Sequence, residues 1–180
     1  MGIETLEDQL RTYIKNFADI MPKRQGFKYS GFESYYLANG HMYQREPYTR
    51  DERIAIMAMM TKMHFSPVIK QCFYNAQNMM LTHGLGYAEG YVVSDDLPIP
   101  IHHGWNVLNG KPVDLTLQRG RVRKTANPKM LLERASYNLE HFLYFGVEFP
   151  RETIMSIWRS EEIARPVVDD WKNGFPLLKE

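Results

Sequence analysis

The chain has 180 residues, with 22 Lys and Arg against 21 Asp and Glu, so its formal net charge of +1 provides no global field to recruit nucleic acid or an acidic membrane. Hydrophobic content of 44% and charged content of 24% are typical of a globular protein and exclude disorder as the dominant state. The single cysteine excludes an intrachain disulfide framework, and no hydrophobic signal segment follows Met1. We therefore expect one cytoplasmic domain spanning residues 1–180, with a free thiol and no membrane association.

The first third of the chain predicts one long helix and several short elements. Apolar residues from Ile3 to Met21 recur at the spacing of one helical face. An aromatic-rich stretch follows, in which Phe32–Leu37 and His41–Tyr43 are predicted as short strands around an Asn-Gly turn. Asp51–Met63 is apolar without clear periodicity, so both a strand and a short helix remain open for it.

The only cysteine, Cys72, stands just before an amphipathic run that predicts a helix ending near Thr82, with Gly84 beyond it. Ser66-Pro67 is a good cap and first-turn pair, which favours a helix start at that point. Such a start would place Cys72 in the second turn, where the helix dipole contributes less. Tyr87–Ser94 then alternates as a strand, and the following stretch to Pro100 reads as a loop.

The Asn109-Gly110 pair is the strongest turn signal in the chain. Both central positions of a type I′ hairpin turn need positive φ, which Asn and Gly tolerate. Counting outward from this turn places His103 and Asp114 as diagonal neighbours on one face of the hairpin. Such neighbours lie roughly 7–8 Å apart at Cα, a gap that an imidazole and a carboxylate can bridge. The same count places His102 on the opposite face, and a one-residue slip would exchange the two histidines.

The last third predicts a basic segment and two helices. Residues 119–124 read Arg-Gly-Arg-Val-Arg-Lys, which is either a solvated loop or a clamp for an acidic substrate or a phosphate backbone. Asn127-Pro128 predicts the start of a helix that runs to Tyr144 or Phe145, and Arg151–Arg165 predicts a second one. Neither helix carries a catalytic pattern.

Cys72, His103 and Asp114 supply the residue types of a thiol acyl-transfer site. A thiol becomes a strong nucleophile as a thiolate, which a neighbouring imidazolium stabilises. The imidazole returns the proton to the leaving group, while a carboxylate fixes its tautomer and orientation. The alternative for Cys72 is a small buried hydrophobe, because it shares helical spacing with Ala76 and Met79.

Three motifs resemble transglutaminase-like cysteine enzymes, part of the wider papain-like group. That family carries a Gly-Gln-Cys-Trp element at a helix start, His-Ala-Trp-Asn on a strand and Asp-Pro-Thr on the next strand. Gln71-Cys72-Phe73, His103-Gly104-Trp105-Asn106 and Asp114-Leu115-Thr116 look like these elements, with Lys70 in place of the first glycine. The resemblance implies an α+β fold in which a helix that starts near Gln71 carries the catalytic Cys and packs against an antiparallel sheet bearing His and Asp.

By this resemblance Cys72 is the nucleophile, His103 the base and Asp114 the orienting acid. Gln71, or backbone N–H groups near Cys72, are candidates for oxyanion stabilisation, and Glu89 and Trp105 for further contacts with the site or substrate. Glu89 has the alternative of a solvated carboxylate. No cofactor is required, and the remaining histidines show no metal-ligand spacing: His41, His64, His83, His102 and His141.

The expected function is attack on an amide or ester carbonyl in a protein, peptide or small amide, followed by hydrolysis. Deamidation of a side chain and cross-linking to an amine share the same acyl-enzyme, so they remain alternatives. A further alternative is a catalytically silent module that binds a protein or nucleic-acid partner. Nucleic acid is not the expected partner, because the net charge is close to zero.

Overall fold

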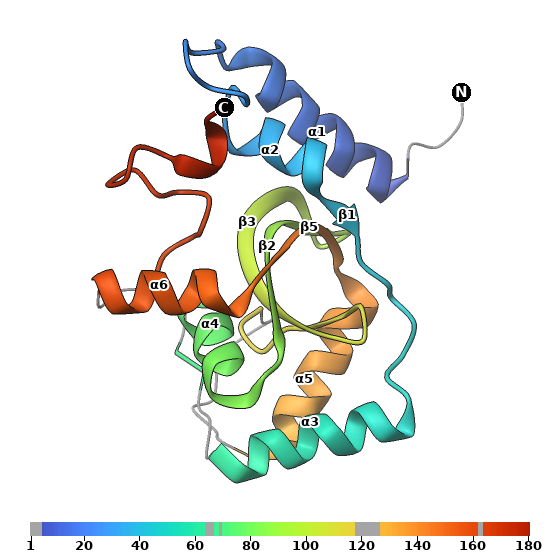
Figure 1. The fold of residues 1–180 in the computed structure, drawn as a ribbon. Helices are drawn as coiled ribbons and strands as arrows, with labels where there is room; N and C mark the ends of the chain where they lie inside the picture. Colours follow the sequence, from blue (N-terminus) through green and yellow to red (C-terminus); the bar gives the residue numbers. More distant parts are fainter. Residues whose placement is uncertain (1–4, 64–66, 69, 118–126, 162–163) are drawn as a thin grey trace.

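The computed structural model describes residues 5–63, 67–68, 70–117, 127–161 and 164–180, and its fold is mixed α+β. Five strands form an antiparallel sheet in the order β1-β5-β2-β3-β4. Their bounds are β1 (His41–Met42), β2 (Gly86–Ser94), β3 (Leu97–Leu108), β4 (Lys111–Val113) and β5 (Leu143–Phe149). Figure 1 shows the strands curled together at the centre of the molecule.

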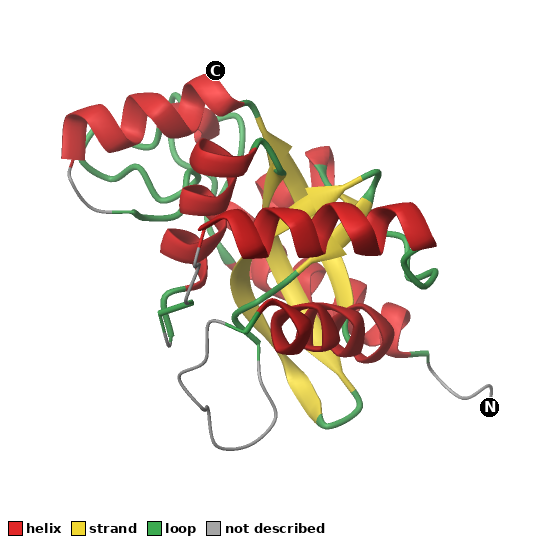
Figure 2. Cartoon of the chain, turned by 90° about the horizontal axis from the view of Figure 1, so that it is seen from below, coloured by secondary structure: helices red, strands yellow, loops and turns green. Residues whose placement is uncertain are grey.

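Six α-helices in the described ranges surround this sheet, and Figure 2 shows helices on both of its sides. They are α1 (Leu6–Ile20), α2 (Phe32–Asn39), α3 (Arg50–Met63), α4 (Cys72–His83), α5 (Pro128–His141) and α6 (Arg151–Glu161), and a short 3-10 helix, η1 (Pro176–Leu178), lies near the C-terminus. None of the helices described is long and apolar enough to cross a membrane.

Three apolar clusters of described residues pack these helices against the sheet. One packs α1, α2, α4 and α6 against β2 and β5. A second joins α3 and α5 to the β4 end of the sheet. The third fills the curl of the sheet and is centred on Trp105 and Tyr144, which are both almost fully buried. Hydrophobic burial on both sides of β2 and β5 therefore fixes the strands from which the candidate site is built.

Several predicted elements are confirmed. The first helix begins at Leu6, after a capping box in which the side chains and backbones of Thr5 and Asp8 bond reciprocally. The segment left open between strand and helix is α3. The hairpin register is as counted, since Leu108 pairs with Lys111 across the Asn-Gly turn. Asn109 and Gly110 both take positive φ, as a type I′ turn demands.

The strand predicted at Phe32–Leu37 is wrong, because this segment is helix α2. Ser34 Oγ accepts a hydrogen bond from the Gly31 N–H and so supports the first turn. The helix buries the Tyr36 ring completely, and its hydroxyl reaches Glu89 and His102 on the sheet. Aromatic residues are enriched in strands, which is why the sequence pattern predicts one here. The packing of these rings in the folded protein makes the segment a helix instead.

The prediction of one helix from Asn127 to Tyr144 or Phe145 is wrong at its end. Helix α5 stops at His141, and Leu143–Phe149 is strand β5, which pairs with both β1 and β2. A strand buried on both faces reads as a continuous apolar run, which periodicity does not distinguish from a helix.

The prediction of a loop up to Pro100 is also wrong, because β3 begins at Leu97. The ladder between β3 and β4 covers only Asn106–Leu108, so Pro100 lies where β3 has no β4 partner. A proline is tolerated at such an open edge because its missing N–H breaks no ladder bond.

The helix predicted over Arg151–Arg165 is confirmed at its start, but it ends at Glu161. The basic run at residues 119–124 lies outside the residues that the structure describes.

Candidate active site

Cys72 is the first residue of α4, so its side chain lies at the positive end of the helix. Gln71 is the N-cap, is exposed, and provides no side-chain bond to the first turn. Lys70 has a φ of 60°, in the left-handed region that favours glycine.

Gly104 allows α4 to approach the sheet closely. A Cβ at this position would lie 2.8 Å from a ring carbon of Phe73 and 3.3 Å from its Cα. The start of α4 therefore rests directly on β3, one residue beyond His103. Asn106, also on β3, donates from its amide nitrogen to the carbonyl oxygens of Ala76 and Gly86, and so holds the next turn of α4 in place.

The hairpin brings His103 and Asp114 together as the register predicts. His103 Nε2 lies 2.8 Å from Asp114 Oδ2, and both side chains are buried. The charge of His103 acts on the Cys72 side chain and lowers its pKa. Because Nε2 is engaged with Asp114, Nδ1 is the ring nitrogen left for the sulfur. The three residues thus lie in the order thiol, imidazole, carboxylate.

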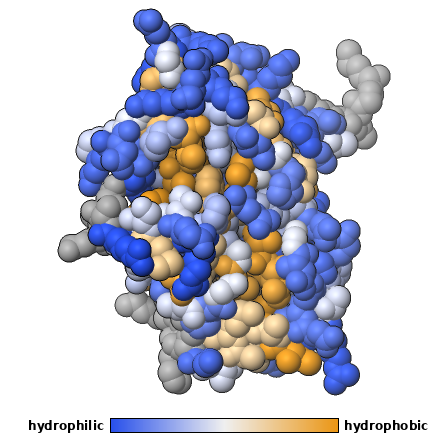
Figure 3. Space-filling view, viewed as in Figure 1, coloured by the Kyte–Doolittle hydropathy of each residue, from blue (hydrophilic) through white to orange (hydrophobic). Residues whose placement is uncertain are grey.

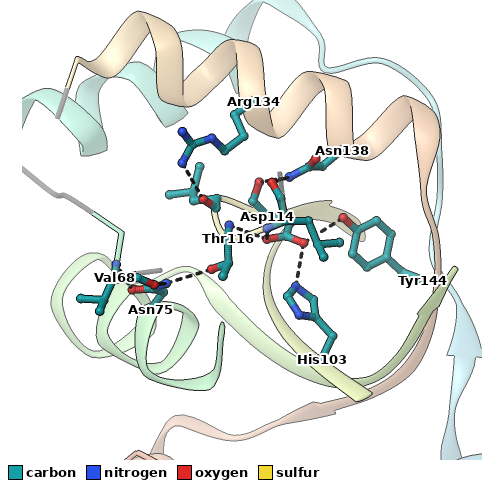
Figure 4. A network of polar contacts seen from close by, with 10 residues as sticks. Val68, Asn75, His103, Asp114, Thr116, Arg134, Asn138 and Tyr144 are labelled. Atoms are coloured by element: carbon teal, nitrogen blue, oxygen red, sulfur yellow. Dashed lines mark hydrogen bonds and ion pairs between the residues drawn. The ribbon is translucent and has the colours of Figure 1, made fainter. Parts of the chain in front are cut away.

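Asp114 is held by donors from two strands and a loop. Besides His103, the Tyr144 hydroxyl donates to Oδ2 at 3.0 Å, and the N–H groups of Thr116 and Leu117 donate to Oδ1. In Figure 4 the carboxylate lies between the His103 and Tyr144 side chains. A carboxylate that accepts this many hydrogen bonds is fixed in orientation and kept ionised.

Helices α4 and α5 fix the segment after β4. Asn138 of α5 donates to the carbonyl oxygens of Asp114 and Leu117 (Figure 4). Asn75, one turn after the cysteine on α4, donates to Thr116 Oγ1 and bonds both backbone groups of Val68. These contacts set the distance between the helix that bears the thiol and the loop that bears the acid.

The electrostatics of this cluster favour a charged pair of sulfur and imidazole. Burial lowers the pKa of His103, but the charge and hydrogen bond of Asp114 outweigh it and raise the pKa to about 10. Burial raises the pKa of Cys72, but the hydrogen bond and charge of His103, with the Gly104 N–H, bring it below its ordinary value. Burial also raises the pKa of Asp114, but the charge and hydrogen bond of His103 and two N–H groups bring it below its ordinary value.

His102 has a different environment on the opposite face of β3. Its Nε2 lies 2.7 Å from the Tyr36 hydroxyl, and its ring contacts Tyr91, Phe32 and Phe73. Burial, with the charge of His103, lowers its pKa to about 4, so His102 is a neutral ring at physiological pH. The two adjacent histidines are therefore distinct, as the hairpin count predicts.

Glu89 was expected to support the site, to contact a substrate or to be solvated, and the structure contradicts the last two of these alternatives. Glu89 is fully buried, and its two oxygens accept bonds from the hydroxyls of Tyr36 and Tyr87 and the N–H groups of Val167 and Val168. Burial raises its pKa to about 7, against the effect of these four donors. Glu89 therefore attaches the C-terminal segment to β2.

Trp105 is 1% exposed, so it lies beneath the site and out of reach of a substrate. Its ring is nearly parallel to the His103 ring, with an interplanar angle of 13° and centroids 6.4 Å apart. It supports the imidazole by packing. Among the expected residues other than the three central ones, only Gln71 is exposed beside the thiol.

Sequence reasoning missed Tyr144, Asn138 and Asn75, which position the three central residues. Tyr144 was expected at the end of a helix, and its role depends on β5 lying next to β2. The two asparagines stand inside helices, where a short polar side chain at a buried position is the only available signal. Their partners are distant in sequence, so the pattern of residues does not reveal them.

We expect Tyr144→Phe to slow alkylation of Cys72 by iodoacetamide roughly tenfold, because the ring stays and one hydrogen bond to a charged carboxylate is lost. Tyr43→Phe is the matched control, since Tyr43 is also buried and its hydroxyl has no partner among the described residues. Second-order rate constants measured by mass spectrometry check this prediction. Equal rates in both variants would contradict a role of the Tyr144 hydroxyl in the site.

No cluster of three or more potential metal-binding side chains occurs among the described residues. Comparisons with protein-family models, curated proteins and solved structures found no match. The roles assigned to Cys72, His103 and Asp114 therefore depend on the geometry of the site.

Proposed function

We propose that this protein is a thiol-dependent acyl-transfer enzyme with a Cys72-His103-Asp114 triad on a transglutaminase-like, papain-related fold. One observation carries the proposal: a thiol at a helix N-terminus whose pKa the His103 imidazole lowers, with a carboxylate 2.8 Å from Nε2 of that imidazole. The proposed substrate is an amide or ester in a protein, peptide or small molecule. A free cysteine as nucleophile fits a reducing compartment such as the cytoplasm.

In the proposed mechanism the Cys72 thiolate attacks the carbonyl carbon and forms a carbon–sulfur bond. The His103 imidazolium then gives its Nδ1 proton to the leaving nitrogen or oxygen, and the carbonyl–heteroatom bond breaks. Water loses a proton to the neutral imidazole and attacks the acyl-enzyme, which releases the acid and restores the thiolate. Asp114 holds Nε2 throughout and so keeps Nδ1 directed at the sulfur.

The first turn of α4 is the proposed site of oxyanion stabilisation. The first N–H groups of an α-helix have no acceptor within the helix. The N-cap Gln71 does not cap them with its side chain, and its exposed amide is available for the same purpose. A tetrahedral oxyanion on a carbon bonded to Cys72 would form beside these donors.

Hydrolysis is the proposed outcome, because water is always available to the acyl-enzyme. Transfer to an amine, as in a cross-linking enzyme, uses the same first half of the reaction and is the alternative. Incubation of candidate amides in ¹⁸O-labelled water separates the two, since hydrolysis and deamidation introduce solvent oxygen and transfer to an amine does not.

The test of the triad is the pH dependence of Cys72 alkylation by iodoacetamide. The pKa of Cys72 is lowered and that of His103 is raised to about 10, so the charged pair exists between these two values. We expect a reactive plateau that begins below the ordinary thiol pKa of about 8.5, and hydrolytic activity that falls as pH approaches 10. A single ordinary thiol titration would overturn the proposal and would favour a binding module.

A further inference from the structure

A preformed pocket of about 320 Å³ lies between the end of α1, the start of α2 and the C-terminal turn around η1. Its walls are mainly apolar, and the side chains that line them include Met21, Phe27, Phe32, Phe175 and Leu178. Its size falls in the range of small-ligand pockets, roughly 300–1,000 Å³. Figure 3 shows hydrophobic surface on this face, between the α1–α2 pair and α6.

The pocket is held open by backbone contacts between distant parts of the chain. Phe27 forms a bridge with Lys179, and the N–H groups of Lys28 and Tyr29 both donate to the carbonyl oxygen of Leu178. Phe175 has a φ of 57°, a left-handed conformation that a bulky residue adopts only under strain. Its ring packs 6.0 Å from that of Phe32 across the pocket wall. Strain of this kind persists where the surrounding structure enforces it.

An aromatic wall connects the pocket to the candidate active site. The Phe32 ring, which lines the pocket, stacks on His102 with centroids 6.3 Å apart. Another neighbour of the His102 ring is Phe73, at 5.2 Å, and Phe73 directly follows Cys72 at the start of α4. All three rings are partly exposed. The wall therefore runs from Phe73, the residue after Cys72, to the pocket along the face of β3 that bears His102.

The chemistry of the pocket suits an apolar side chain on a chain with polar backbone groups. Polar side chains are few in its lining, where Arg24 and Glu33 carry opposite charges. The Arg24 guanidinium lies over the Phe27 ring, and Glu33 accepts a bond from the Tyr91 hydroxyl. A small amide at Cys72 would not reach a pocket that lies beyond two further rings, whereas an extended peptide would.

We propose that this pocket is a subsite for an apolar, aromatic-sized side chain of an extended peptide substrate whose reacting carbonyl lies at Cys72. The inference rests on the proposed function and narrows its substrate class to peptides and unfolded protein segments. Burial of such a side chain supplies binding energy at a distance from the reacting bond, which favours one sequence over another.

The test uses chloroacetamides that alkylate Cys72 and carry either a naphthyl or a carbamoyl group on flexible linkers of increasing length. We expect the naphthyl probe to react about tenfold faster at an intermediate linker length, where the linker matches the span to the pocket. Met21→Glu places a charge in the lining and should remove this preference. Ile20→Glu is the matched control, because Ile20 is 73% exposed and does not line the pocket.

Plain iodoacetamide, which has no tail, separates the subsite from the triad. If the iodoacetamide plateau is intact and both tails react equally at every length, the subsite is refuted while the proposed function stands. If Met21→Glu and Ile20→Glu reduce the preference equally, a general charge effect explains it and the subsite is refuted. An ordinary thiol profile with iodoacetamide refutes the proposed function, and the subsite with it.

Discussion

His103→Gln is expected to slow alkylation of Cys72 roughly tenfold about one pH unit below the ordinary thiol pKa of about 8.5, because a thiol without its imidazole partner is mostly protonated there. In the native protein the charge of His103 lowers the pKa of Cys72 from its ordinary value. Glutamine keeps a polar side chain that can donate to Asp114, so the buried carboxylate is not left alone. The measurement is the rate of iodoacetamide adduct formation as a function of pH.

His102→Gln is the matched control at the adjacent position. His102 faces the Tyr36 hydroxyl on the other side of β3, and glutamine can bond to the same partner. We expect this variant to keep the reactive plateau at low pH. Loss of the plateau in His102→Gln, with retention in His103→Gln, would mean that the roles of the two histidines are exchanged and that the triad is misassigned.

Asp114→Asn is expected to have the largest combined effect on reactivity and stability. Without the carboxylate, burial lowers the pKa of His103, so the imidazolium that stabilises the thiolate is lost. In a triad of this kind the change also disturbs the tautomer, and we expect turnover to fall on the order of 10³- to 10⁴-fold. The free energy of unfolding should fall by about 3 kcal/mol, because a buried charged pair loses one partner.

The pH dependence of the stability difference identifies the pair that is responsible. The lowered pKa of Asp114 gives stability that is present above its unfolded value of 3.8 and lost as pH falls below it. The raised pKa of His103 gives stability that is fully present below 6.5 and lost as pH rises toward about 10. The difference between wild type and Asp114→Asn should therefore be largest between about pH 4 and 6.5.

Urea denaturation of both proteins across this range measures the difference, with Asp95→Asn as the control. Asp95 is exposed in the turn between β2 and β3, so the same chemical change should have little effect there. A stability difference for Asp114→Asn that does not vary with pH would contradict an ionised pair in the folded protein.

Short-range signals in the sequence are sufficient to predict the local parts of the candidate site. The Asn109-Gly110 turn sets the hairpin register through its backbone conformation, and the register places His103 and Asp114 on one face. The end of the helix before Gly84 follows from amphipathic spacing and a left-handed C-cap, whereas its start at Cys72 agrees with the family resemblance and not with the Ser66-Pro67 signal. These features depend on residues close together in the chain, so local physical chemistry is sufficient to predict them.

The distant residues that support and surround that site become apparent only from the packing of the folded chain. Tyr144 reaches Asp114 because β5 lies beside β2 in the sheet, and a doubly buried apolar strand has no periodicity that separates it from a helix. Glu89 was expected to contact the site, a substrate or solvent, but the C-terminal segment covers it and supplies two backbone donors to its carboxylate. Such contacts join segments far apart in sequence, and their energy appears only once the chain has packed.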